Sequence, residues 1–555
     1  MKSLIKKKLF VAFILFSFCF GGNGLQFVFP QDLPKESAIT AATAEESPLA
    51  AVFYILASAG KDSKVREKSC LTASFARAGN FSNLEKAADL IEKGSYVDSD
   101  FISLVDELLR AGKSREASNF LSYLLKRFED DPDNLEKMPK ILIRLGRDEE
   151  ALKIASRLDD YAKVGAFFEI ASAYLESGSR ENALKSIESI SERIEKAEND
   201  RDKAKLGLFY ARLGKEEQSL RLLRQSLKNI DWKAKIPAPD AAWIIDDAFA
   251  AYLLLGKYQL AWQLLEKQGK SEEASSLIQI ARGHLARGDR KKADELLERA
   301  AKSLNPNEYG DSFDLGKMVE IYLSLGETEK ALSIAKSIAG SEYMRQKQLL
   351  GVADFYLQKR DRKSARAVLS FALEQTRKID TGEEESGSLW TSGRWEQARY
   401  QSQIAAKLIE MRLEKEALRL IAQIGKPYLR AQLLTEFVKE NLPSRKSAKN
   451  LRPHLEEALS LVRGGRQEIF DSNKYDVYAI IARQFAEIGD AEKANDVFAE
   501  VLSKDAEMIE KGSDSYLLVA MCKIGVEFEK SGVKPSEKVR AALRNIIKNR
   551  ANGEY

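Results

Sequence analysis

Histidine, cysteine and proline are scarce in this chain of 555 residues, which contains 2, 3 and 12 of them respectively. The two histidines, His284 and His454, are too few for most metal sites and for most mechanisms that use histidine as a general base. Rare proline, together with abundant Leu, Ala, Lys and Glu, is typical of a helical protein. Lys and Arg exceed Asp and Glu by only 4, and this balance argues neither for nor against a polyanion as partner.

The three cysteines, Cys19, Cys70 and Cys522, are widely separated in the sequence. Cys70 and Cys522 each sit among apolar residues of an expected helix, so we predict two small buried thiols. Because these two residues lie near opposite ends of the chain, we do not expect a disulfide between them.

Recognisable catalytic signatures are also missing from the sequence. It contains no P-loop, no HExxH, no CxxC and no nucleotide-binding glycine fingerprint following a strand. Paired carboxylates are plentiful, but they fall on polar helix faces with Lys or Arg three or four residues away, where ion pairs contribute little. We therefore expect no enzyme activity, no cofactor and no metal site.

The first 24 residues have the pattern of an export signal. A basic start is followed by an apolar run of 12 residues from Leu9 to Phe20, and Gly24 offers a small residue for cleavage. An uncleaved N-terminal anchor remains an alternative, as does a lipoprotein modified at Cys19, although Phe18 precedes it instead of a small residue. All three alternatives place the body of the protein outside the cytoplasm, in the periplasm, in the cell envelope or secreted.

One pattern recurs along most of the remaining chain. Turn glycines follow one another at intervals of 32–42 residues up to Gly326, and Arg360 and Arg412 stand in the glycine's place in two later units. A small residue follows the turn by five positions, an aromatic residue often precedes it by four, and Ala or Gly often precedes it by seven. The turn glycines are Gly79, Gly112, Gly146, Gly178, Gly214, Gly256, Gly288, Gly326, Gly489 and Gly532.

This pattern predicts pairs of antiparallel helices. Glycine ends the first helix in a left-handed conformation, the small residues let the two helices approach closely, and the aromatic residue fills the space around that contact. A single pair buries too little surface to be stable alone, so the units must stack. Over roughly residues 65–555 the pattern resembles the tetratricopeptide repeat (TPR), although the tryptophan and proline of that family are mostly missing. The resemblance implies an all-α, right-handed superhelical solenoid of stacked helix pairs.

The sequence divides into five segments on this basis. We expect a signal peptide over 1–24, a flexible tether over 25–46, and helical repeats over 47–379. We expect an inter-repeat loop over the irregular stretch 380–396. Further helical repeats and a C-terminal cap are expected over 397–555. Ser47 followed by Pro48 is expected to open the first helix.

We predict a function from the positions that the pattern leaves free. On the first helix of a pair, residues about 10, 6 and 3 before the turn should face inward, for example Ile278, Arg282 and Leu285, or Gly316, Glu320 and Leu323. These positions mix apolar residues with charges of both signs, which suits a protein or peptide partner. Tryptophans of the 380–396 loop could contact a partner too, or pack back onto the helices. The candidate partner-binding residues are Arg282, Glu320, Asp354, Trp390, Arg394 and Trp395.

The sequence therefore predicts an exported TPR-like scaffold that mediates protein–protein interactions, with membrane contact only through a possible N-terminal anchor. An envelope hydrolase, or an inactive relative similar to the superhelical lytic transglycosylases, is the alternative. Such an enzyme needs a separate compact domain with a glutamate of raised pKa, and only about 20 residues follow Gly532. An RNA-binding repeat protein conflicts with the export signal and the balanced charge, so no nucleic-acid partner is expected.

Overall fold

The computed structural model describes residues 41–58, 65–91, 98–232, 239–270, 273–379, 393–442, 448–464, 471–509 and 514–551. Within these ranges the regular structure is helical throughout, and the helices alternate between a first helix, A, and an antiparallel second helix, B. The A helices are α4 (Val65–Ala78), α6 (Asp98–Arg110), α9 (Met138–Arg144), α11 (Asp160–Glu176), α13 (Asp200–Arg212), α15 (Pro239–Leu255), α17 (Ala274–Ala286), α19 (Tyr309–Ser324), α21 (Glu342–Gln358), α23 (Gly393–Glu410), α25 (Pro427–Asn441), α27 (Asp471–Glu487) and α29 (Asp514–Ser531).

Each A helix is followed by its B helix. The B helices are α5 (Leu84–Asp89), α7 (Ser114–Arg127), α10 (Asp148–Arg157), α12 (Arg180–Lys196), α14 (Glu216–Ser226), α16 (Tyr258–Gln268), α18 (Arg290–Ser303), α20 (Thr328–Ser337), α22 (Arg362–Thr376), α24 (Glu414–Gln423), α26 (Ala448–Gly464), α28 (Ala491–Ile509) and α30 (Glu537–Ala551). The elements outside these pairs are α2 (Ala41–Ala44), α3 (Pro48–Ser58), η2 (Phe81–Asn83) and α8 (Pro132–Leu135). The predicted fold class, an all-α solenoid of stacked helix pairs, is confirmed. None of the described helices is long and apolar enough to cross a membrane.

The turns between A and B helices have the geometry that the glycine pattern predicted. All ten turn glycines have positive φ, and Arg360 (φ 60°) and Arg412 (φ 55°) adopt the same left-handed conformation. At Gly178, the amide of Ser179 donates to the carbonyl of Tyr174 (2.8 Å) and the amide of Gly178 donates to that of Leu175 (3.1 Å). This pattern satisfies the last carbonyls of the helix and turns the chain back.

Replacing Arg360 by glycine should stabilise the protein, because a left-handed conformation costs a residue with a Cβ about 1–2 kcal/mol. Arg360 is exposed, so its side chain is dispensable for the core. The greater freedom of glycine in the unfolded chain offsets part of the gain. We expect the free energy of unfolding to rise by about 0.5–1 kcal/mol, measured by urea denaturation. The reverse change at a matched turn, Gly178→Arg, should lower it, and a rise in both variants would contradict this account.

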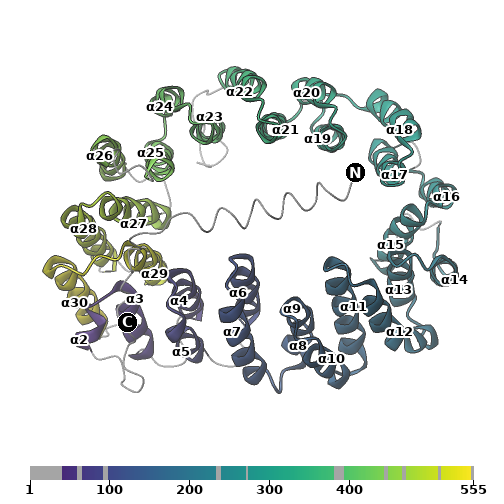
Figure 1. Ribbon diagram of the computed structural model, residues 1–555, viewed down its shortest axis with the longest axis horizontal. Helices are drawn as coiled ribbons and strands as arrows, with labels where there is room; N and C mark the ends of the chain where they lie inside the picture. The colour runs from purple at the N-terminus through teal and green to yellow at the C-terminus, as the bar shows by residue number, and fades with distance from the viewer. Residues whose placement is uncertain are drawn as a thin grey trace, which may run out of the picture.

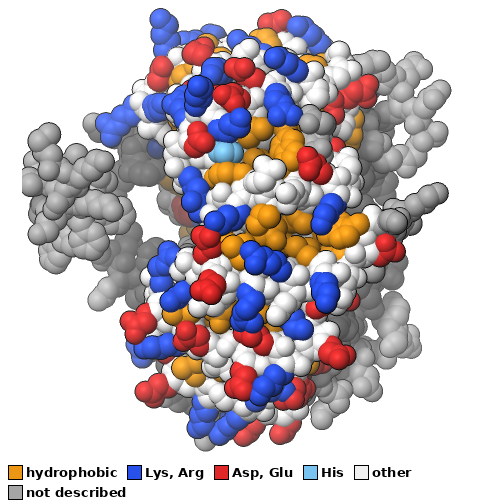
Figure 2. All heavy atoms as spheres, turned by 90° about the vertical axis from the view of Figure 1, so that its right-hand side faces the viewer, with side chains coloured by type: hydrophobic (Ala, Val, Ile, Leu, Met, Phe, Trp, Pro, Cys, Tyr) orange, Lys and Arg blue, Asp and Glu red, His pale blue; other side chains and the backbone are white. Residues whose placement is uncertain are grey.

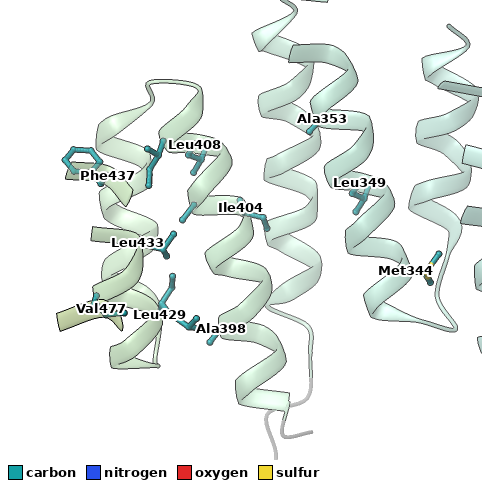
Figure 3. Close-up of a cluster of buried hydrophobic side chains, with 14 of the residues drawn as sticks. Met344, Leu349, Ala353, Ala398, Ile404, Leu408, Leu429, Leu433, Phe437 and Val477 are labelled. Atoms are coloured by element: carbon teal, nitrogen blue, oxygen red, sulfur yellow. The ribbon is translucent and has the colours of Figure 1, made fainter. Parts of the chain in front are cut away.

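The core follows the small residues of the repeat. The residue five positions after the turn is fully buried in the units whose turns are described, from Ala117 to Ala494. A Cβ built on Gly207, seven positions before its turn, would lie 2.9 Å from Leu223 Cδ2, so glycine is needed for close contact there. Figure 3 shows the core passing from one A helix to the next through α21, α23 and α25, with Met344, Leu349, Ala353, Ala398, Ile404, Leu408, Leu429, Leu433 and Phe437.

The stack of helix pairs closes on itself to form a ring (Figure 1). The first A helix, α4, packs along the last one, α29, and α3 packs against α29 and α30. Arg540 and Arg544 of α30 form ion pairs with Glu46 (3.2 Å) and Glu45 (3.0 Å). Nothing in the repeat pattern predicted this closure, which turns an array with two ends into one continuous core.

The structure also corrects three expectations. Residues 41–44, expected to belong to a flexible tether, form α2, and Ala44 is fully buried. Cys70 and Cys522, expected at opposite ends of the array, lie on the two helices α4 and α29 that pack together. The predicted inter-repeat loop over 380–396 ends earlier than expected, because α23 begins at Gly393. Ser47 does open α3, because its Oγ accepts from the amide of Ala50 (3.2 Å).

Candidate binding surface on the inner face of the ring

The A helices lie on the inner side of the ring and the B helices on the outer side (Figure 1). Because the B helices cover one side of each A helix, the exposed side of an A helix faces the middle of the ring. We call this surface the inner face. The outer face around α14, α16 and α18 carries charges of both signs interspersed with hydrophobic patches (Figure 2).

Three predicted residues, at the position six before the turn, lie on this inner face and pair across neighbouring A helices. Arg282 of α17 lies 3.5 Å from Glu320 of α19, and both side chains are about half exposed. Asp354 of α21 lies 2.7 Å from Lys407 of α23. The structure therefore brings these residues together, but each already has a partner within the chain.

Similar ion pairs join A helices elsewhere on the ring. Arg144 of α9 contacts Asp106 of α6 (3.0 Å) and Glu176 of α11 (3.2 Å). Arg77 of α4 donates to Glu107 of α6 (2.9 Å), and this hydrogen bond lowers the pKa of Glu107. Because these side chains are largely exposed, each pair stabilises the fold by no more than about 1 kcal/mol. Their clearer effect is to neutralise the inner face locally.

At two units the position ten before the turn does not face inward, contrary to our prediction, whereas the equivalent Asp246 of α15 is exposed. Ile278 is fully buried. Gly316 is covered by the next A helix, because a Cβ built on it would lie 2.6 Å from Met344 Cε and 2.8 Å from Gln348 Nε2. In these two units the position is therefore buried by packing.

The inner face carries a group of exposed aromatic residues that the sequence analysis missed. Six large hydrophobic side chains of the described residues are exposed, and all six belong to A helices. Five of them stand 17 or 13 residues before their turn, near the N-terminal end of the helix. Because successive A helices run parallel, these ends share one edge of the ring. We call this set the aromatic rim: Tyr161 (80% exposed), Trp243 (56%), Tyr309 (65%), Phe313 (39%) and Tyr343 (48%).

Cations accompany the aromatic rim. The guanidinium carbon of Arg201, on α13, lies 5.2 Å from the ring centroid of Trp243 on α15. That of Arg399, on α23, lies 5.7 Å from the ring centroid of Tyr343 on α21. Both arginines stand 13 residues before their own turn, the same position that Trp243 and Phe313 occupy in their units. Cation–π contacts of this kind hold aromatic rings in place at an exposed surface.

The three candidate residues predicted in the 380–396 loop differ in their structural environment. Trp390 lies outside the described residues. Arg394 is exposed in the first turn of α23, whereas Trp395 is half-buried and packs against the core. Trp395 stands 17 residues before the turn at Arg412, the same position as Tyr161, Tyr309 and Tyr343. The predicted inward positions 10 and 6 before the turn, moved two helical turns toward the N-terminus, become positions 17 and 13, which are those of the aromatic rim.

The described residues hold no cluster of His, Cys, Asp and Glu that could bind a metal ion. Burial raises the pKa of Glu529, which also interacts with Ser47. This glutamate joins α29 to the start of α3 at the ring closure, so its environment is explained by packing. His284 is packed within the repeat: its ring stacks on Tyr258 with 3.7 Å between the ring centroids, and its Nδ1 lies 3.0 Å from Asp289 Oδ2. The ring of His454 contacts that of Phe437 edge-on.

These features define the class of the protein: a helical-repeat protein closed into a ring. No protein-family model and no curated protein matches the chain. Among solved structures it is similar to a circular tandem repeat protein with novel repeat topology (17% identity, 91% of this chain and 99% of that chain, TM-score 0.16). It is also similar to Naa15/Naa10 bound to HypK-THB (15% identity, 76% of this chain and 68% of that chain, TM-score 0.27). A third similar structure is yeast Tom70 (13% identity, 78% of this chain and 96% of that chain, TM-score 0.21). At these scores the fold rests on the structure itself.

Proposed function

We propose that this chain is an exported scaffold that binds a protein or peptide segment along the inner face of its ring. The aromatic rim carries the proposal. Exposed Tyr, Trp and Phe side chains are enriched at binding sites because they bury a large area while losing little conformational freedom. Packing gives no reason why the large exposed hydrophobic side chains of the described residues should all lie on one set of helices.

The charge around the aromatic rim favours a polypeptide over a polyanion. Basic residues flank the rim, but the ion pairs that join the A helices contribute as many acids as bases to the same inner face. A nucleic acid would require a continuous basic surface for its phosphates. A polypeptide can place apolar side chains on the aromatic rings and polar groups on the mixed charges beside them.

Export rests on the N-terminal pattern of basic residues followed by an apolar run. This segment lies outside the described residues, so the proposal draws on the sequence alone. The envelope or the extracellular space is the expected compartment. A scaffold there would hold its partner on the inner face while the B helices and their charged outer surface keep the ring soluble.

Replacing Phe313 by alanine should weaken partner binding about tenfold, because truncating a central aromatic contact costs more than 1 kcal/mol. The measurement is a crosslinking pull-down from the envelope fraction, followed by titration of the recovered partner against the purified variant. Trp262→Ala is the matched control, since Trp262 lies on the outer helix α16 beside Arg299. It should leave binding unchanged.

Three outcomes would contradict the proposed function. Absence of the chain from the envelope and extracellular fractions would remove the export part. Equal loss of binding in the Phe313 and Trp262 variants would show that the aromatic rim has no special role. Hydrolysis of a cell-wall glycan by the purified protein, lost on changing one acid, would support the hydrolase alternative instead.

A further inference from the structure

The ring closure brings together two cysteines that are separated by almost the whole chain. Cys70 lies on α4, the first A helix, and Cys522 lies on α29, the last. These two helices pack along each other as neighbouring A helices do elsewhere in the ring. Cys70 is half-buried and Cys522 is fully buried. They are the two cysteines of the described residues.

The two thiols are in contact. A side-chain hydrogen bond with Cys522 is the largest influence on Cys70 and lowers its pKa, while burial raises it. A hydrogen bond with Ser74 and the positive charges of Lys523 and Arg77 lower the pKa further. Cys70 therefore combines partial exposure with an environment that favours the thiolate, and the thiolate is the form that attacks disulfides.

The N-terminal helix α3 also lies close against α29 near Cys522. Gly525 lies one turn further along α29, and a Cβ built on it would lie 2.6 Å from Leu49 Cδ2 and 3.1 Å from the backbone nitrogen of Leu49. Leu49 belongs to α3, so this contact holds α3 tightly against α29 beside the junction. The proximity that a disulfide needs, with its Cα atoms within about 7 Å of each other, comes from α4, which packs along α29.

We propose that Cys70 and Cys522 form a disulfide that closes the ring covalently. The oxidant is a small-molecule or protein disulfide. The Cys70 thiolate attacks one sulfur of this oxidant, forms a mixed disulfide and releases the first thiol. The Cys522 thiolate then attacks the Cys70 sulfur and releases the second thiol. The two cysteines lose two electrons and two protons, and the oxidant gains both as it becomes two thiols.

This bond would crosslink the first and last repeats of the array. A repeat array can fray from its ends, because each unit contacts only its neighbours. A ring held by noncovalent contacts can open at any one interface, and the junction between α4 and α29 is one of these. With the disulfide in place, opening at that junction is prevented even when the contacts around it are lost. The proposal does not depend on what the inner face binds.

The test uses the full chain with Cys19→Ser, so that Cys70 and Cys522 are its two remaining cysteines. The protein is incubated folded with glutathione disulfide, its free thiols are alkylated, and it is digested with trypsin without reduction. We expect peptide 69–77 joined to peptide 512–523, two hydrogens lighter than the separate peptides and released by a reductant. On a nonreducing denaturing gel, the oxidised chain should migrate faster than the reduced chain, because a large loop keeps it compact.

Cys70→Ala and Cys522→Ala, each in the same background, are the matched controls, and both should abolish the joined peptide. Circular dichroism checks that each variant folds, and Cys70 is the safer site because it is only half-buried. The proposal is overturned if folded protein leaves both thiols open to alkylation after oxidation. It is also overturned if the oxidised product is an intermolecular dimer, or if the joined peptide forms only in urea.

Discussion

Replacing Gly525 by leucine should break the ring at its junction and destabilise the protein by about 3 kcal/mol, the upper end of overpacking effects. A Cβ alone would already lie 2.6 Å from both Cγ and Cδ2 of Leu49 and 3.1 Å from its backbone nitrogen. Leu49 is fully buried, so it has no free space in which to move. The strain can be relieved only if α3 moves away from α29. We expect a lower urea midpoint and, by small-angle X-ray scattering, a larger radius of gyration as the ring opens.

The matched control is Gly351→Leu, a glycine inside another A helix, α21. A Cβ built on Gly351 meets no atom within 4 Å. Leucine is a better helix former than glycine, so this variant should be neutral or stabilised by up to about 1 kcal/mol. If Gly525→Leu kept the wild-type radius of gyration and urea midpoint, the closure seen in Figure 1 would not contribute to stability in solution.

The repeat pattern predicted local structure well because its signals act within one helix pair. Positive φ at Gly178 is required to end a helix and reverse the chain, whatever the rest of the array does. The same holds for Ala183, which is fully buried because two helices must approach within one unit. Even Arg360 and Arg412 were correctly predicted to occupy turns, because the small residues around them keep the spacing of the repeat.

Closure of the ring could not be predicted in this way. Whether a stack closes depends on the small rotation between successive units, summed over the whole array. No local pattern encodes that sum. The consequence was the error over Cys70 and Cys522, whose separation in sequence suggested separation in space. Contacts such as Arg544 with Glu45 exist only because the sum brings the two ends together.

The binding surface falls between these two cases. The inner position of Arg282 followed from the repeat spacing, and the same spacing leads to Tyr309 and Tyr343 three helical turns earlier. Exposure at that position depends on the neighbouring unit, however. Trp395 occupies the equivalent place and is half-buried against the core. Spacing alone therefore indicates which residues can face inward, and packing between units decides which of them do.

Replacing Gly340 by alanine should destabilise the protein by about 3 kcal/mol, because here the obstacle is backbone. A Cβ on Gly340 would lie 2.3 Å from the carbonyl carbon of Glu308 and 2.7 Å from that of Asn307. The amides of Ala339 and Gly340 both donate to the carbonyl of Pro306 at 2.8 Å. Relieving the clash separates the segments that precede α19 and α21, so both hydrogen bonds are lost as well.

The loss at Gly340 should be confined to one interface of the array. Because repeat proteins unfold through nearest-neighbour contacts, we expect hydrogen exchange to accelerate first in α19 to α21, ahead of the rest of the ring. The control is Gly425→Ala, in the equivalent linker between α24 and α25, where a Cβ meets nothing within 4 Å. Urea denaturation should show a large loss for Gly340→Ala and almost none for Gly425→Ala. Equal losses in the two variants would mean that linker flexibility sets the stability, and that contact between successive linkers does not.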